Sequence, residues 1–223
     1  MIAALRSSFS DRRIAVVISL GVLSGFVVAM LAARVLYTRR FDHTGIAWNL
    51  FLAWIPFVLA LVVYQRARFG MSRPALLALG GLWLLFFPNA PYIVTDLKHI
   101  GGAGRIPVLY DVLFLSAAAW TGLLLGLTSL FLMHAVARRV LGVASAWALV
   151  VGVLAASSFG IYLGRVQRWN SWDVFVRPGA LLGQVANGFH AAPLALTVLL
   201  TSFLLTSYLV FYSLARMSAH IRD

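Results

Sequence analysis

Six long runs of apolar residues, separated by short segments rich in arginine, constrain this chain more than any other feature of its sequence. A run of about 20 apolar residues is long enough to cross the hydrocarbon core of a bilayer as a helix. The core contains no water to bond the backbone N–H and C=O groups, and a helix pairs these groups within itself. The sequence therefore predicts an all-α, polytopic membrane helix bundle that forms a single integral membrane domain over residues 1–223. We expect six spans at about residues 14–36, 46–63, 74–97, 107–133, 140–163 and 191–214.

The composition excludes several classes of protein. Hydrophobic residues make up 62% of the chain and charged residues only 11%, a balance that a soluble domain of this size does not tolerate. The absence of cysteine removes disulfides, thiol nucleophiles and thiolate metal sites. The 18 basic residues are spread among the loops rather than gathered beside stacking aromatic residues. We therefore expect membrane lipids as partners and no nucleic acid.

Two prolines, Pro88 and Pro91, interrupt the third apolar run. Residues 74–87 make a helix only about 21 Å long, shorter than a hydrocarbon core of about 30 Å, so the interruption falls at membrane depth. A proline donates no backbone hydrogen bond and disfavours a helical conformation at the residue before it, so we predict a Pro-broken third span. The freed carbonyl groups need partners inside the protein, and the Asn89 amide is placed to supply one.

Polar residues follow this break between positions 89 and 99. Broken helices with polar residues near one membrane face form the sites of many transporters and intramembrane enzymes. A proline-kinked helix that ends at the interface, with Tyr92 as an aromatic anchor, explains the same residues without a site, and both interpretations stay open. The spacing of Asp96 and His99 suits a metal ion, but two ligands without an assured third predict no metal site.

A second polar stretch, residues 164–173, follows the fifth span. Arg165 and Arg168 are three residues apart and share a face if the helix continues, which gives a pair of cations suited to phosphate or carboxylate. Residues 174–189 are amphipathic and too polar to span, so we expect them to lie on the membrane surface or to re-enter it.

Six spans place the first, third and fifth loops on one membrane face, together with four of the six acidic residues, all of which are Asp. We expect a polar cluster on that face. The candidate catalytic residues are Asp96, Asp111, Asp173 and His99, and the candidate substrate-binding residues are Asn49, Asn89, Tyr92, Arg165, Arg168 and Asn170.

Asp111 lies one turn inside the predicted fourth span and has two explanations. It can complement the N-terminus of that helix, which is worth at most about 1 kcal/mol. Alternatively it is a proton carrier, a general base or the partner of Arg165 or Arg168. We favour the second group of roles.

Small residues recur every four positions on two of the predicted spans. Gly122 and Gly126 mark a packing face on the fourth, and Gly152, Ala156, Gly160 and Gly164 form a stripe on the fifth. Small residues in this pattern let another helix backbone approach closely. We therefore expect each stripe to face a neighbouring helix.

Loop charge predicts the orientation. The N-terminus, the second and fourth loops and the tail hold ten Lys or Arg, against eight in the other loops. Three of those eight, Arg165, Arg168 and Arg177, lie in or beside the second polar stretch and are candidates for function. Setting them aside favours cytoplasmic termini, because cytoplasmic loops carry the excess of basic residues.

Several motifs resemble the domain-of-unknown-function 1361 family of bacterial membrane proteins. The resemblance covers roughly residues 46–214 and includes the Trp-Asn motif at 48–49, Phe-Pro-Asn-Ala-Pro-Tyr at 87–92, Tyr-Asp at 110–111 and Arg-Trp-Asn-Ser-Trp-Asp at 168–173. It implies a multi-pass protein of the bacterial cytoplasmic (inner) membrane, and it supplies no activity.

Three functions remain open on the sequence. An enzyme acting on an anionic lipid-linked or envelope substrate would hold phosphate with Arg165, Arg168 and Arg177, and would use an Asp beside His99 as base or nucleophile. A transporter would build a solute site at residues 88–91 and carry protons on an Asp. A structural or assembly subunit would use the same residues only for packing. No known catalytic or cofactor-binding motif is present, so we expect no cofactor.

Overall fold

The computed structural model describes residues 2–101, 106–167, 169, 176–180, 183 and 191–220. This part of the chain is helical, with turns between the helices and no strand. The elements are α1 (Ile2–Thr38), α2 (Gly45–Ala67), α3 (Arg73–Phe86), α4 (Asn89–Tyr92), the 3-10 helix η1 (Ile93–His99), α5 (Val108–Leu141), α6 (Val143–Val166) and α9 (Ala191–His220).

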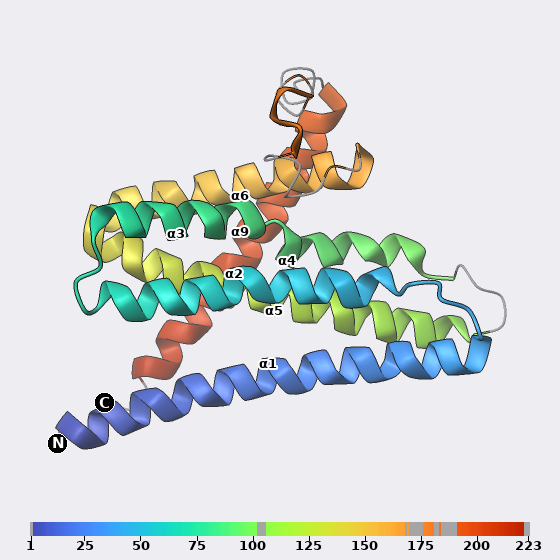
Figure 1. The fold of residues 1–223 in the computed structure, drawn as a ribbon, viewed down its shortest axis with the longest axis horizontal. Coiled ribbons are helices and arrows are strands. Elements are labelled where there is room, and N and C mark those ends of the chain that lie inside the picture. Colours follow the sequence, from blue (N-terminus) through green and yellow to red (C-terminus); the bar gives the residue numbers. More distant parts are fainter. Residues whose placement is uncertain are drawn as a thin grey trace.

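Six helical segments of the described chain are long and apolar enough to cross a membrane, which confirms the predicted all-helical membrane bundle. The first, second and fifth are α1, α2 and α6, and the third combines α3, α4 and η1. In Figure 1, α1 runs along one side of the bundle, α3 and α6 lie on the other, and α9 crosses obliquely behind them. The start of α1 and the end of α9 lie at the same end of the bundle (Figure 1).

Helix α5 forms the centre of the bundle and contacts α1, α2, α4, η1, α6 and α9. Phe114 and Leu125 on α5 are fully buried against the apolar faces of α1 and α2. A second buried cluster joins α5 to α3, α6 and α9 through Trp83, Leu154 and Tyr208. By contrast, α1 and α9 bury few of their apolar residues, as expected of helices at the edge of a bundle, where lipid covers the outer face.

The third span changes its helical geometry around the two prolines. Helix α3 ends at Phe86, a turn covers residues 87–88, and α4 and η1 follow. The Ala90 N–H bonds to the Phe87 carbonyl at 3.1 Å, and the Asn89 side-chain amide donates to the Phe86 carbonyl at 2.9 Å. The Asn89 side chain therefore supplies a hydrogen bond to a carbonyl that the local backbone leaves available.

Glycines on α5 and α6 allow the short helix α4 to pack closely. A Cβ atom on Gly122 would lie 2.5 Å from the Ala90 carbonyl oxygen, and one on Gly126 would lie 3.3 Å from the Ala90 side chain. On α6, a Cβ on Gly160 would lie 3.4 Å from Pro88, and one on Gly164 would lie 3.3 Å from the Tyr92 ring. Close backbone approach thus packs α4 against α5, and the two α6 glycines leave room for Pro88 and the Tyr92 ring.

The predicted stripe on α6 is only half correct. Gly152 and Ala156 are exposed, and nothing lies within 4 Å of a Cβ built on Gly152. The four-residue spacing does place all four small residues on one stripe. However, the segment that packs there is short and reaches only Gly160 and Gly164, in the C-terminal part of α6.

Two predicted boundaries also change. Helix α5 continues through Leu141, so Arg138 and Arg139, which we expected in a loop, lie in its last turns. The prediction ended the span where the apolar run ends, but arginine is a good helix former and does not end a helix. The helix ends only before Gly142, whose φ is +85°. Similarly, α1 continues to Thr38, two residues beyond the predicted end of the first span. The predicted amphipathic segment 174–189 falls largely outside the described residues.

We expect Gly122→Ala to lower the free energy of unfolding by about 1 to 3 kcal/mol, because the added methyl group collides with the α4 backbone. The matched control is Gly152→Ala, which meets no neighbour and should be neutral or stabilising by up to about 1 kcal/mol. Thermal unfolding of the detergent-purified variants measures both. Equal stability of the two variants would contradict the close approach of α4 to α5.

Candidate functional site

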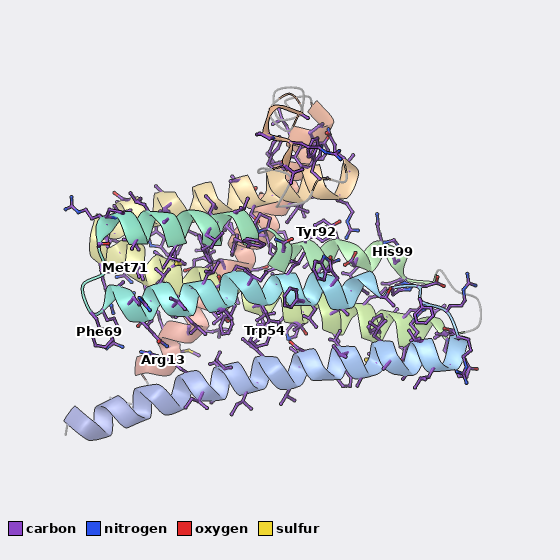
Figure 2. The ribbon with its side chains drawn as sticks, in the orientation of Figure 1. Arg13, Trp54, Phe69, Met71, Tyr92 and His99 are labelled. Atoms are coloured by element: carbon purple, nitrogen blue, oxygen red, sulfur yellow. The ribbon has the colours of Figure 1, made fainter. Side chains whose placement is uncertain are left out.

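Four separate elements meet at the candidate site, which we call the Arg165 cluster. It consists of Asn49 on α2, Tyr92 on α4, Thr95 and Asp96 on η1, and Arg165 in the last turn of α6. In Figure 2, Tyr92 and His99 lie along the α4–η1 segment, and Phe69 and Met71 mark the opposite end of the bundle. The cluster therefore belongs to the end of the molecule formed by the first, third and fifth loops.

The Arg165 guanidinium group is held by three residues. Its Nη2 atom lies 2.6 Å from Asp96 Oδ1, and its Nε atom donates to Thr95 Oγ1 at 2.7 Å. Its Cζ atom lies 4.3 Å from the centroid of the Tyr92 ring, a cation–π geometry. These contacts fix both the position and the plane of the guanidinium group.

Asp96 uses both carboxylate oxygens inside the protein. Oδ1 faces Arg165, and Oδ2 accepts a hydrogen bond from the Asn49 amide at 3.1 Å. Only 7% of the Asp96 side chain is exposed, against 16% of the Arg165 side chain. The two charges neutralise each other, and the arginine is the partner that solvent or a ligand reaches more easily.

Local structure explains why Thr95 and Asp96 face α6. The Thr95 hydroxyl donates to the Tyr92 carbonyl at 2.6 Å, so it can accept the hydrogen bond from Arg165 at the same time. Gly164 has no side chain, which leaves room for the Tyr92 ring beneath Arg165. Sequence reasoning did not select Thr95 as a candidate residue. Two features could have identified Thr95: it lies next to Asp96 in the sequence, and its hydroxyl can both donate and accept a hydrogen bond.

A second ion pair, between Arg34 and Asp111, joins α1 to α5. Arg34 Nε lies 3.0 Å from Asp111 Oδ1, and the exposed fractions of the two side chains are 0% and 2%. The neighbouring Tyr110 hydroxyl donates to the Met30 carbonyl at 2.6 Å and fastens the same two helices. Pairing with Arg165 or Arg168 was one of the three roles considered for Asp111, and the structure pairs it with Arg34 instead. A charged residue inside an apolar span needs a partner of opposite charge. The position of Arg34 within the first predicted span could therefore have pointed to an Asp on a neighbouring helix.

The histidine at the end of η1 faces another histidine. The ring centroids of His99 and His43 lie 5.9 Å apart in an edge-to-face arrangement, and the His43 ring also contacts Phe114. Throughout the described part of the chain, no three His, Asp or Glu side chains are grouped as they would be around a metal ion.

The structure thus brings together four of the predicted site residues, Asn49, Tyr92, Asp96 and Arg165. It places Asp111 with a different arginine and His99 beside His43, and it uses the Asn89 amide to bond a backbone carbonyl. The catalytic and binding roles of these residues stay predictions. Three further candidates, Arg168, Asn170 and Asp173, lie outside the described residues.

The family model described as "Protein of unknown function (DUF1361)" matches residues 48–207. The chain belongs to the DUF1361 family. The matched segment contains every residue of the Arg165 cluster, as well as Asp111, whereas Arg34 precedes it. No curated protein and no solved structure matches this DUF1361 chain significantly.

We expect Asp111→Asn to destabilise the DUF1361 protein by about 3 to 5 kcal/mol, because it leaves the Arg34 charge buried without a counter-ion. The matched control is Asp42→Asn. Asp42 pairs with Arg40 at 2.9 Å, but the two side chains are 66% (Arg40) and 43% (Asp42) exposed, so its loss should cost no more than about 1 kcal/mol. Thermal unfolding in detergent compares them. An Asp111→Asn variant as stable as wild type would show that the buried pair is not needed for the fold.

Proposed function

We infer that this protein binds the anionic headgroup of a lipid-linked or envelope substrate through Arg165, at the non-cytoplasmic face of the bacterial inner membrane. One observation carries the proposal. The Nε and Nη2 atoms of Arg165 are engaged by Thr95 and Asp96, and Nη1 makes no hydrogen bond within the described part of the chain. The guanidinium group is therefore oriented by the protein with one donor group left for a ligand.

Arginine suits this role better than lysine because its donors lie in one rigid plane that matches phosphate and carboxylate oxygens. The Tyr92 ring and the two polar partners restrict that plane before a ligand arrives. A side chain ordered in advance loses less conformational entropy on binding. A substrate phosphate or carboxylate group at the membrane boundary is the chemistry that such a site favours.

Loop charge supports the orientation in this proposal. The first, third and fifth loops and their flanks hold eight basic residues, and the face with the chain ends holds ten. Without Arg165, Arg168 and Arg177, which are candidates for function, five basic residues stand against ten. Basic residues concentrate in cytoplasmic loops, so we assign both termini to the cytoplasm.

The same geometry gives a catalytic version of the proposal. An anion that binds Arg165 competes with Asp96 for the guanidinium group. This competition weakens the ion pair between Arg165 Nη2 and Asp96 Oδ1. A carboxylate released in this way beside the bound headgroup can act as a general base. Asp173 and His99 are the further candidates for proton transfer in this version.

A structural or assembly role is the second candidate, and one observation favours it. The polar side chains that follow the break already have partners inside the protein: Asn89 bonds the Phe86 carbonyl, Thr95 bonds the Tyr92 carbonyl, and Asp96 bonds Asn49 and Arg165. Such bonds hold helices together without any ligand. Transport with a protonated Asp stays a hypothesis that no contact described above favours.

The proposal predicts that an anionic short-chain lipid stabilises the purified protein through Arg165. Dihexanoyl phosphatidic acid should raise the melting temperature of wild type in detergent, and dihexanoyl phosphatidylcholine should raise it much less. Arg165→Lys should weaken phosphatidic acid binding by roughly tenfold or more, because it removes an oriented, charge-assisted hydrogen bond. The control is Arg40→Gln, which removes an exposed charge from the same face and should bind as wild type does.

A second variant, which keeps the Arg165–Asp96 ion pair, distinguishes weaker binding from misfolding. Thr95→Val removes the hydroxyl that orients Arg165 but leaves Asp96 in place, so we expect a folded protein with several-fold weaker binding. Unchanged binding in folded Arg165→Lys and Thr95→Val would overturn the headgroup proposal. Equal stabilisation of wild type by both lipids would favour the structural candidate.

A further inference from the structure

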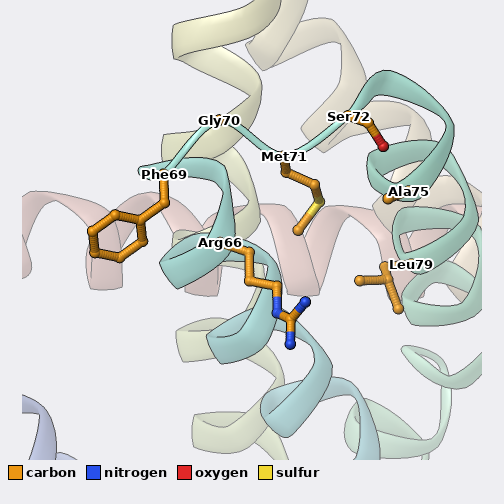
Figure 3. Close-up of a pocket in the computed structure, with 7 residues that line it drawn as sticks. All are labelled: Arg66, Phe69, Gly70, Met71, Ser72, Ala75 and Leu79. Atoms are coloured by element: carbon orange, nitrogen blue, oxygen red, sulfur yellow. The ribbon is translucent and has the colours of Figure 1, made fainter.

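A pocket of about 470 Å³ lies between the end of α2 and the start of α3, at the end of the bundle opposite the Arg165 cluster. Its lining includes Arg66 at the end of α2, Met71 and Ser72 in the connection, and Ala75 and Leu79 on α3. Figure 3 shows the Arg66 guanidinium group, the Met71 side chain and the Leu79 side chain turned toward a common space, while the Phe69 ring points away. The volume falls in the range of sites that hold a small molecule or part of a lipid.

The pocket has both polar and apolar lining. Arg66 and Ser72 supply the polar side chains, and Met71, Ala75 and Leu79 form an apolar wall. Figure 3 shows the Arg66 side chain extending toward the level of Leu79, away from Ser72. Leu79 lies about 10 Å beyond Ser72 along the axis of α3. The Ser72 side chain makes no capping hydrogen bond to α3. A ligand that matches this lining has an anionic group that accepts from Arg66, joined to an apolar chain that contacts Met71, Ala75 and Leu79.

The charge of the described residues around the pocket is positive. The three ion pairs in the described part of the chain involve Arg34, Arg40 and Arg165, all at the other end of the bundle. Arg66 therefore has no carboxylate partner among the described residues, and Arg68 and Arg73 add charge nearby. A soluble anion would match these arginines but not the apolar wall, and an apolar peptide would match the wall but leave Arg66 without a counter-ion.

We propose that this pocket, which we call the α2–α3 pocket, is a binding site for one anionic phospholipid of the leaflet on that face. Its phosphodiester group accepts hydrogen bonds from Arg66, and an acyl chain lies against Met71, Ala75 and Leu79. An anionic phospholipid is the abundant membrane component that has both features at this depth. The site is independent of the Arg165 cluster and of the function proposed for it.

Native mass spectrometry of the detergent-purified full chain tests this proposal by counting bound lipids. Wild type should bind one dioleoyl phosphatidylglycerol more tightly than dioleoyl phosphatidylcholine, which has the same chains. Arg66→Gln should weaken phosphatidylglycerol binding roughly fivefold or more. The matched control is Arg68→Gln, which removes an exposed charge two residues away that does not line the pocket, and we expect it to bind nearly as wild type does.

A second pair of variants tests the apolar wall without changing charge. Leu79→Trp fills the α2–α3 pocket and should weaken phosphatidylglycerol binding, whereas Leu77→Trp places the same side chain on an exposed position of α3 and should not. Equal effects of Arg66→Gln and Arg68→Gln, or of the two tryptophan variants, would overturn the proposal. Displacement of the lipid by millimolar inorganic phosphate alone would also overturn it, since it would identify a site for a soluble anion.

Discussion

A charge inside a bilayer needs a partner, and this requirement organises the end of the molecule that carries the candidate site. Asp96 and Asp111 come from different spans, and each is paired with an arginine from yet another span. The Arg34–Asp111 pair is buried between α1 and α5. Removing one partner of a buried pair lowers the free energy of unfolding several times more than breaking an exposed pair does. The Arg165–Asp96 pair ties η1 to α6 and stays partly open, so the two pairs share a chemistry but differ in access.

The geometry of the third span makes the open pair possible. The prolines at 88 and 91 bring in a short helix that a regular span would not contain. Gly122 leaves room for this helix on α5, and Gly160 leaves room for Pro88 on α6. η1 then carries Thr95 and Asp96 to the end of α6. A local break in one helix therefore sets the contacts of a residue some 70 positions further along the chain.

Much of this arrangement could be predicted from the sequence, because apolar runs and loop order decide which residues share a membrane face. Loop order alone groups Asn49, Tyr92, Asp96 and Arg165 on one face. It could not assign partners, since pairing depends on helix rotation and tilt, and the ion-pair alternative that it offered for Asp111 named Arg165 or Arg168 rather than Arg34. It also overestimated the stripe on α6, because spacing locates a ridge of small residues but not the length of the helix that packs on it.

The length of α5 has a consequence for how the protein sits in its membrane. Its 34 residues form a helix about 51 Å long, well beyond a hydrocarbon core of about 30 Å. Such a helix must lean strongly or project from the bilayer. Because α5 contacts most of the other spans, a lean of α5 would incline the whole bundle, whereas a projecting α5 would carry its neighbours' ends out of the hydrocarbon core with it.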